Sequence, residues 1–219
     1  ETAIEIAKND WIITTDADCL VQKDWLTTFD QYIQENEVEM VASGVCYLPK
    51  NGFLSAFQNL DFLSLQGATI GSFGIGKPFM CNGANFAYSK QFFKELNGFQ
   101  GNETIASGDD VFLLQKAVSV APKKVGFLLA KESIVATNPV ATWSDLFQQR
   151  VRWASKSTGY SSVYGKLLAL LVFGGNLAWI MSFLLWLMGL LDQNIFMLFV
   201  ALKFLIDFIL IYKTANFFE

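Results

Sequence analysis

The sequence predicts an α/β domain that is followed by a hairpin of two transmembrane helices. Over residues 1–140, segments with helical spacing alternate with short β-branched segments, which is typical of an α/β layer fold. Residues 167–191 then contain no charged side chain, and about 20 apolar residues are enough to span a bilayer. After a short polar loop, residues 195–212 are apolar except for one lysine and one aspartate, so we expect the chain to cross back.

The elements of the α/β region follow one another in a regular order. The expected strands, which are short and rich in apolar residues, cover residues 11–15, 40–47, 84–88 and 125–130. The expected helices, which carry apolar residues at helical spacing, cover residues 23–35, 53–65, 91–96 and 110–118. The helix at 53–65 includes Gln58, Asn59 and Asp61, which make it too polar for a third span.

A glycine-rich stretch at residues 71–77 matches the spacing of a phosphate-binding Walker loop. Pro78 stands where that loop needs the Ser or Thr that binds Mg²⁺, and proline also removes a backbone donor. We therefore interpret residues 71–77 as a flexible loop.

Composition and charge exclude several classes of function. The 219 residues include no histidine, which excludes Ser-His-Asp and Cys-His catalysis and every metal site that needs imidazole. Cys19, Cys46 and Cys81 form no closely spaced pair, so neither a disulfide framework nor a structural zinc site is expected. The net charge of −4 arises from residues 1–163, which argues against nucleic acid as a partner. Any chemistry must rest on carboxylates, backbone groups, lysine or arginine.

The charge distribution around the hairpin predicts its orientation. Only 16% of the residues are charged, whereas a soluble domain has about 25%. Basic residues lie before the first span and after the second, while the connecting loop carries only Asp192. By the positive-inside rule the α/β region is cytoplasmic, which predicts a multi-pass protein of the cell inner (plasma) membrane. The basic residues are Arg150, Arg152, Lys156, Lys166 and Lys213.

Two charged residues lie within the second span. Lys203 and Asp207 stand one helical turn apart, so that their charges can neutralise one another. They could line a path for a substrate or form an ordinary contact between helices. We favour the helix contact.

Two aspartates directly follow the first strand, as Asp16-Ala17-Asp18. Residues two apart in an extended chain face the same side, so both carboxylates are expected to point together from the carboxyl end of the strand. Open α/β sheets bind ligands at that end, and paired carboxylates suit Mg²⁺ or Mn²⁺. A solvated turn is the alternative for this short motif.

A second acidic pair, Asp109 and Asp110, follows Gly108 at the start of a predicted helix. Such residues could simply complement the helix dipole. In a chain without histidine, one of them is also the expected general base. Gly-Asp-Asp occurs in viral RNA polymerases too. Those enzymes need a basic template channel and have no membrane hairpin, so we do not favour that interpretation.

A third polar motif, "FQQRVRW", ends just before the hairpin. Thr142 and Asp145 have the spacing of a capping box at the start of its helix. Gln149, Arg152 and Trp153 then lie at i, i+3 and i+4 and project from one face. An amide, a guanidinium and an indole suit diphosphate oxygens and a sugar ring, although an interfacial helix would also carry Arg and Trp.

The ordered motifs "TTDADC", "CNGANFAYSK", "LNGF", "SGDDVFLLQK" and "QQRVRW" resemble those of the membrane-bound glycosyltransferases of family 2, which include cellulose, chitin and hyaluronan synthases. The resemblance implies a GT-A fold and inverting sugar transfer from a nucleotide-diphosphate sugar, with a UDP-sugar as the expected donor. It also implies domains at residues 1–140 (a partial, cytoplasmic GT-A domain), 141–163 (an amphipathic interface helix) and 164–219 (two transmembrane helices). The family's opening strand has no counterpart, and the chain begins with Glu1 inside an apparent helix, so we expect an amino-terminal segment to precede it.

The resemblance assigns roles to the two acidic pairs. Asp16 and Asp18 match the motif that holds the metal, Mg²⁺ or Mn²⁺, and the donor diphosphate. Asp110 matches the catalytic base, and Asp109 occupies the acidic position before it.

The resemblance also assigns roles to the remaining motifs. Gln149 and Arg152 match diphosphate-binding residues, and Trp153 matches the residue that contacts the acceptor sugar. The acceptor loop would include Asn82, Gly83 and Asn85.

The function expected on this basis is transfer of a sugar to a glycan or lipid-linked acceptor at the membrane, in cell-envelope polysaccharide synthesis. A non-processive lipid glycosyltransferase is the alternative within enzymes. A catalytically inactive membrane scaffold or transporter subunit is the alternative outside them.

Overall fold

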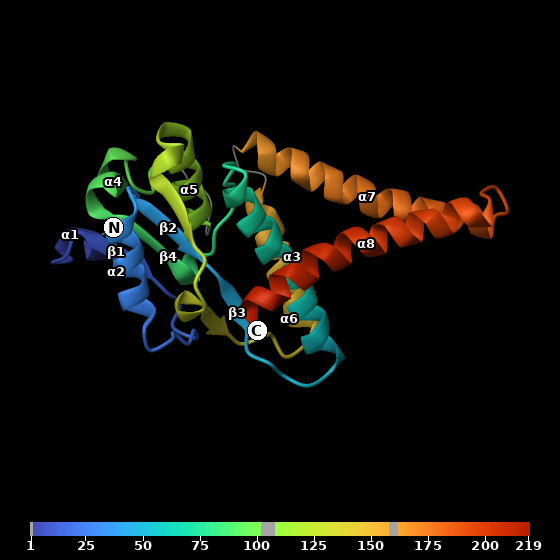
Figure 1. Cartoon of the computed structure of the whole chain (residues 1–219), viewed down its shortest axis with the longest axis horizontal. Coiled ribbons are helices and arrows are strands. Elements are labelled where there is room, and N and C mark those ends of the chain that lie inside the picture. The colour runs from blue at the N-terminus through green and yellow to red at the C-terminus, as the bar shows by residue number, and fades with distance from the viewer. Residues whose placement is uncertain (1, 102–107, 158–161) are drawn as a thin grey trace.

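The computed structural model describes residues 2–101, 108–157 and 162–219. Figure 1 shows an α/β domain from which a long helical hairpin projects. The helices of the domain are α1 (Thr2–Ile6), α2 (Trp25–Glu35), α3 (Phe53–Gly74), α4 (Lys90–Glu95), α5 (Asp109–Val120) and α6 (Trp143–Ser157). Short 3₁₀ turns lie at Gly83–Asn85, Pro122–Lys124 and Lys131–Ser133.

The main sheet has four strands in the order β1-β4-β2-β5. Strand β4 runs antiparallel to both of its neighbours, while β2 and β5 are parallel. The mixed sheet with its covering helices confirms the predicted α/β class. The strands are β1 (Trp11–Thr14), β2 (Met40–Ser43), β4 (Phe86–Ser89) and β5 (Val125–Leu128).

Alternating side chains of the central strands supply two cores, one on each face of the sheet. Met40 and Ala42 belong to the cluster formed with α4 and α5. Val41, between them, belongs to the cluster formed with α2 and α3. Strand β2 is therefore buried on both faces, as expected for a central strand of an α/β layer fold.

Residues 40–47 do not form the single strand that we expected. The segment divides at Gly44 into β2 and a separate β3 (Val45–Tyr47), which pairs in parallel with β6 (Val135–Thr137) in a second sheet. A side chain at Gly44 would meet the Phe218 ring, since a Cβ at this position would lie 2.9 Å from Phe218 Cε1. The division point therefore lies in close contact with Phe218, which no local pattern reveals.

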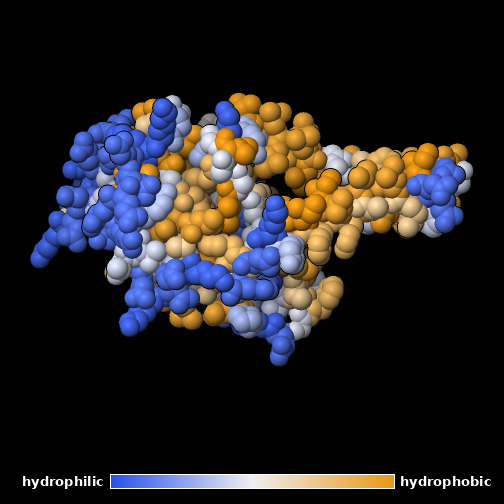
Figure 2. Space-filling view, viewed as in Figure 1, coloured by the Kyte–Doolittle hydropathy of each residue, from blue (hydrophilic) through white to orange (hydrophobic). Residues whose placement is uncertain are grey.

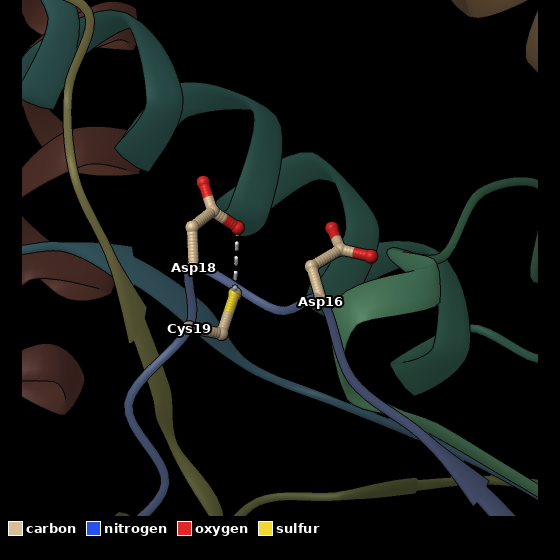
Figure 3. A group of neighbouring side chains, drawn as sticks. All are labelled: Asp16, Asp18 and Cys19. Atoms are coloured by element: carbon tan, nitrogen blue, oxygen red, sulfur yellow. Dashed lines mark hydrogen bonds between the residues drawn. The ribbon is translucent and has the colours of Figure 1, made fainter.

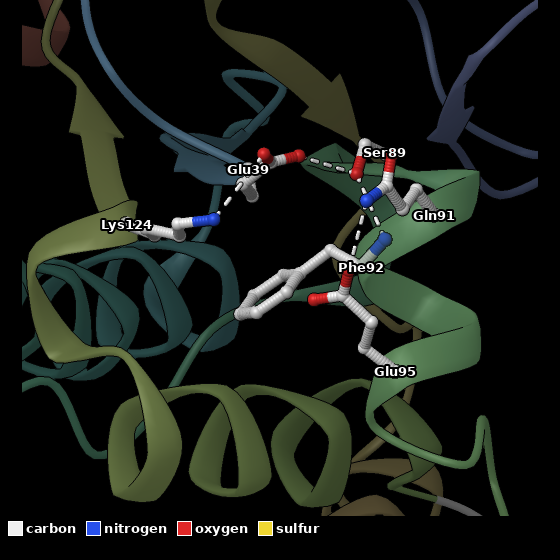
Figure 4. A network of polar contacts seen from close by, with 6 residues as sticks. All are labelled: Glu39, Ser89, Gln91, Phe92, Glu95 and Lys124. Carbon is white, nitrogen blue, oxygen red and sulfur yellow. Dashed lines mark hydrogen bonds and ion pairs between the residues drawn. The ribbon is translucent and has the colours of Figure 1, made fainter.

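A polar network lies at the end of the sheet opposite to Asp16 and Asp18 (Figure 4). Ser89 accepts a hydrogen bond from the Phe92 amide, which caps α4, and donates one to Glu39. Glu39 also pairs with Lys124 at 3.5 Å, and Lys124 lies 5.7 Å above the Phe92 ring. In the same network Gln91 donates to Glu95. These contacts join β2, β4 and the start of β5.

Helix α3 is longer than expected and ends at Gly74. The predicted loop at 71–77 is therefore wrong for its first four residues, which form the last turn of this helix. The carboxyl-terminal half of α3 packs against the second hairpin helix, where a Cβ at Gly67 would lie only 2.3 Å from Thr214 Oγ1. This close approach attaches the hairpin to the α/β domain.

The hairpin consists of α7 (Val163–Leu187) and α8 (Gln193–Phe218). Both helices are long and apolar enough to cross a membrane, and at their shared end Trp186 stacks on Phe196 at 4.9 Å. Figure 2 shows an apolar surface along the hairpin and a hydrophilic surface at its tip and over much of the α/β domain. Lys203 donates to Asp207 within α8, as predicted. The two helices fit a transmembrane hairpin.

Candidate active site

The first acidic pair lies in the turn that follows β1. Asp16 and Asp18 are both exposed, and the Cys19 amide closes the turn by donating to the Asp16 carbonyl at 3.1 Å. One ligand atom from each of Asp16, Asp18 and Cys19 lies within 4.8 Å of the other two. Figure 3 shows the two carboxylates and the thiol gathered on the same turn. The structure therefore brings together the two carboxylates that the sequence singled out.

The chemistry of these groups fits a hard divalent cation. Mg²⁺ and Mn²⁺ prefer oxygen ligands, which Asp16 and Asp18 supply. Burial raises the pKa of the Cys19 thiol, and its Sγ lies 3.9 Å from Asp18 Oδ1 as a weak donor. A neutral thiol is a poor ligand for such an ion, because thiols bind metals as thiolates. The two carboxylates are accordingly the candidate ligands, and Cys19 is a neighbour that the sequence did not single out.

The second acidic pair opens α5. Gly108 precedes the helix with φ of +99°, a conformation that favours glycine, and Asp109 and Asp110 occupy the first turn. The Gly83 amide donates to Asp110 Oδ2 at 2.6 Å. Asp110 is half-buried, whereas Asp109 is exposed. The sequence did not predict this contact, which joins residues 27 positions apart.

Gly83 connects the two acidic sites. Its carbonyl accepts a hydrogen bond of 2.6 Å from Thr14 Oγ1, on the strand that leads to Asp16, while its amide holds Asp110. A Cβ at this position would lie 3.1 Å from Asp110 Oδ2, so a larger residue would push against the carboxylate. Asn82 supports the same turn, because its Oδ1 accepts from the Ala84 amide. Two of the three predicted acceptor-loop residues therefore lie beside Asp110.

The third, Asn85, faces the interior, which leaves its side chain no surface from which to meet an acceptor. Its side chain is completely buried. The amide donates to the carbonyls of Gly44 and Ser133, each at 2.7 Å, and accepts from Trp25 Nε1 at 3.0 Å. Asn85 stabilises the point where β2 gives way to β3, since a buried amide needs its hydrogen bonds to be satisfied.

Burial also determines the state of Cys81, which precedes this loop. Burial, followed by the negative charge of Asp110, raises the pKa of the Cys81 thiol well above its usual value. Cys81 is therefore a neutral core residue rather than a nucleophile.

Helix α6 carries the third motif and begins as predicted. Thr142 Oγ1 accepts from the Asp145 amide at 3.1 Å and donates to the Asp145 carboxylate at 2.7 Å. Gln149 and Arg152 line a surface pocket of about 390 Å³. Gln149 Oε1 is buried and has no hydrogen-bond partner among the described residues, so this residue carries an acceptor that the described residues leave unsatisfied.

Trp153 points to a different neighbour from Gln149 and Arg152. Its ring lies 6.3 Å from that of Phe62 on α3, and it packs against the core cluster that includes Ala84. The residues that line the pocket are Val140, Asp145, Gln148, Gln149 and Arg152. Of the three predicted site residues, Gln149 and Arg152 thus line the pocket, while Trp153 faces α3.

Comparison with known families identifies the chain. The family model for glycosyl transferase family group 2 matches residues 11–217, which include all three polar motifs and the hairpin. The chain belongs to this family. A search of curated proteins gave no significant match.

Membership of glycosyl transferase family group 2 makes the chain a glycosyltransferase. The mixed sheet and its helices fit the GT-A-like α/β domain of such an enzyme, and the two carboxyl-terminal helices fit its membrane-bound form. Membership of this family implies a nucleotide-sugar donor and an acceptor. The scaffold or transporter alternative is therefore disfavoured.

Proposed function

We propose that this glycosyltransferase moves a sugar, with inversion, from a nucleotide-diphosphate sugar to a hydroxyl of a glycan or lipid-linked acceptor. A UDP-sugar is the donor that we expect, and cell-envelope polysaccharide synthesis is the proposed setting. The observation that carries the proposal is the Asp110 carboxylate, held at 2.6 Å by the amide of Gly83, which is itself bonded to the strand leading to Asp16 and Asp18. A direct displacement needs a base for the acceptor and a separate stabiliser for the leaving group.

Asp110 is the proposed base, with Asp109 beside it. The acceptor oxygen forms a bond to the anomeric carbon while its proton passes to the Asp110 carboxylate. The bond from the anomeric carbon to the diphosphate breaks, and the leaving diphosphate takes the electron pair. The Gly83 amide fixes the orientation of the carboxylate throughout.

Asp18 and Asp16 are the proposed ligands of Mg²⁺ or Mn²⁺, because their carboxylates lie close together and are exposed. When bound, such an ion neutralises charge on the diphosphate. Arg152 donates to the diphosphate oxygens, a task that suits its planar guanidinium. Asp145 lines the same pocket, so the site is not purely cationic.

The acceptor is proposed to meet Trp153, Asn82 and Gly83, while Gln149 completes the diphosphate-binding set with Arg152. The unpaired Gln149 Oε1 also suits a sugar hydroxyl, which can donate to it. Trp153 offers part of an indole surface, since it is only half-buried.

The membrane arrangement follows from charge. We propose a cytoplasmic GT-A domain at residues 1–140, an interface helix at 141–163 and a transmembrane pair at 164–219, in the cell inner (plasma) membrane. Basic residues on the domain side of the hairpin support this orientation.

The proposal is tested with the protein in nanodiscs. Candidate nucleotide sugars are supplied with and without Mn²⁺, release of the nucleotide diphosphate is followed, and the anomeric configuration of the product is read by NMR. Metal-dependent release with inversion is expected. Retention of configuration, or full activity in EDTA, would contradict it. Product length on a gel distinguishes polymer synthesis from a single transfer to a lipid-linked acceptor.

A further inference from the structure

Arg150 occupies one of the variable positions of the Gln-x-x-Arg-Trp motif, and it contacts both α3 and the Trp153 ring. Its guanidinium forms an ion pair with Asp61 Oδ2 on α3. The same guanidinium lies over the Trp153 ring, with 4.4 Å between its carbon and the ring centroid. The exposed fractions of the Arg150 and Asp61 side chains are 26% and 37%, so the pair is partly shielded from water.

Helix α3 meets Arg150 and Trp153 with two consecutive residues. Asp61 pairs with Arg150, and Phe62 packs on Trp153 at 6.3 Å. Because Arg150 and Trp153 are three positions apart, they lie on one face of α6. The Trp153 ring is therefore held by Phe62 and the guanidinium together.

The arrangement continues into the second sheet. Phe62 contacts the Tyr47 ring at 4.6 Å, and Phe62 is only 5% exposed. Burial raises the pKa of Tyr47, and the nearby charge of Arg150 opposes that effect. Arg150 thus belongs to a set of contacts that reaches from α6 through α3 to β3.

We propose that Arg150 is a positioning residue for the acceptor: anchored by Asp61, its guanidinium fixes the orientation of the Trp153 ring. This inference rests on the acceptor role proposed for Trp153. The ion pair alone would stabilise this arrangement only slightly, because solvent screens the charges of a partly exposed pair. A planar guanidinium on an indole face adds a cation–π contact, and it defines the ring orientation in a way that a lysine cannot.

The test compares steady-state constants for acceptor and donor in variants of the full chain in nanodiscs. Arg150→Ala should raise the acceptor KM about fivefold and leave the donor KM within about twofold, the loss expected for a partly desolvated cation–π contact. Arg150→Lys keeps the charge but not the planar fork, and should raise the acceptor KM by a smaller factor. The lysine variant still tests the positioning role if the alanine variant folds poorly.

A charge swap separates the positioning role from a merely structural one. Asp61→Arg combined with Arg150→Asp restores an ion pair between α3 and α6 but puts a carboxylate beside Trp153. The melting temperature should recover toward wild type while the acceptor KM stays raised. Recovery of the acceptor KM in this double variant would overturn the proposal.

Lys124 provides a matched control, since it too pairs with a carboxylate, Glu39, and lies over a ring, Phe92. Lys124→Ala should leave the acceptor KM unchanged, and a comparable increase there would overturn the proposal. Trp153→Ala distinguishes a failure of the acceptor role of Trp153 from a failure of the positioning role of Arg150. If it leaves the acceptor KM unchanged, the acceptor role of Trp153 fails. If it raises that KM while Arg150→Ala does not, only the positioning role fails.

Discussion

The two acidic sites of the α/β domain are built in different ways. Asp16 and Asp18 are exposed on a turn beyond the end of β1, where their ligand atoms lie beside the Cys19 thiol. Asp110 is half-buried at the start of α5, and the Gly83 amide fixes one of its oxygens at 2.6 Å. An exposed carboxylate pair gains order from a bound cation, whereas an anchored carboxylate is oriented by the protein itself. The difference suits a metal-binding pair on one side and a preorganised base on the other.

The largest effect should come from changing Asp110, the proposed base. Asp110→Asn keeps the shape of the side chain and an oxygen that accepts from Gly83, but it cannot take a proton. The transfer rate should fall roughly 10²- to 10⁴-fold. Donor affinity, measured by calorimetry in Mn²⁺, should change little. Wild-type turnover in this variant would remove Asp110 from the base role.

The exposed pair should govern donor binding instead. Asp18→Ala removes a proposed metal ligand, so donor affinity in Mn²⁺ should fall roughly 100-fold, the equivalent of a few kcal/mol of charge stabilisation. EDTA should bring the wild type to the level of the variant. An unchanged Mn²⁺ titration would contradict the metal assignment. Together with Asp110→Asn, this variant tests whether the two sites separate binding from chemistry.

A third change tests the anchor itself. Gly83→Ala places a Cβ 3.1 Å from Asp110 Oδ2, which forces the carboxylate or the loop to move. We expect a loss of transfer rate of about tenfold, which corresponds to one charge-assisted hydrogen bond. Gly71→Ala is the matched control, because a Cβ there has nothing within 4 Å. Equal activity of the two variants would contradict this prediction.

The sites differ in how far the sequence could predict them. The gathering of Asp16 and Asp18 is a local property, because both lie in one turn that the Cys19 amide closes on the Asp16 carbonyl, rather than in the extended chain that we expected. The hairpin could likewise be predicted from its apolar runs. The Gly83 contact joins segments 27 residues apart, and the burial of Asn85 depends on Gly44 and Ser133 from two other parts of the chain. Such contacts depend on tertiary packing, which a single sequence does not reveal.

The motif on α6 shows the same limit. Helical spacing put Gln149, Arg152 and Trp153 on one face, and the structure gives the first two a common pocket. Trp153 turns toward Phe62, which lies 91 residues earlier in the chain, so spacing alone could not identify its partner. The same reason explains why the sequence did not single out Arg150: its partner Asp61 also lies on α3.

The smallest effect should come from Cys19, which lies beside the two proposed metal ligands but is not itself proposed as one. Because burial raises the pKa of its thiol, the folded protein holds less thiolate at pH 8 than an unfolded chain does. Iodoacetamide, which reacts with thiolates, should therefore label Cys19 more slowly in the native protein than in urea, and the native rate should rise as the pH is raised. Cys19→Ser should leave Mn²⁺-dependent donor affinity within about twofold, because a hard cation prefers the two carboxylates. A large loss of affinity in this variant would make the thiol a ligand, and the exposed site would then be a three-residue centre rather than a carboxylate pair.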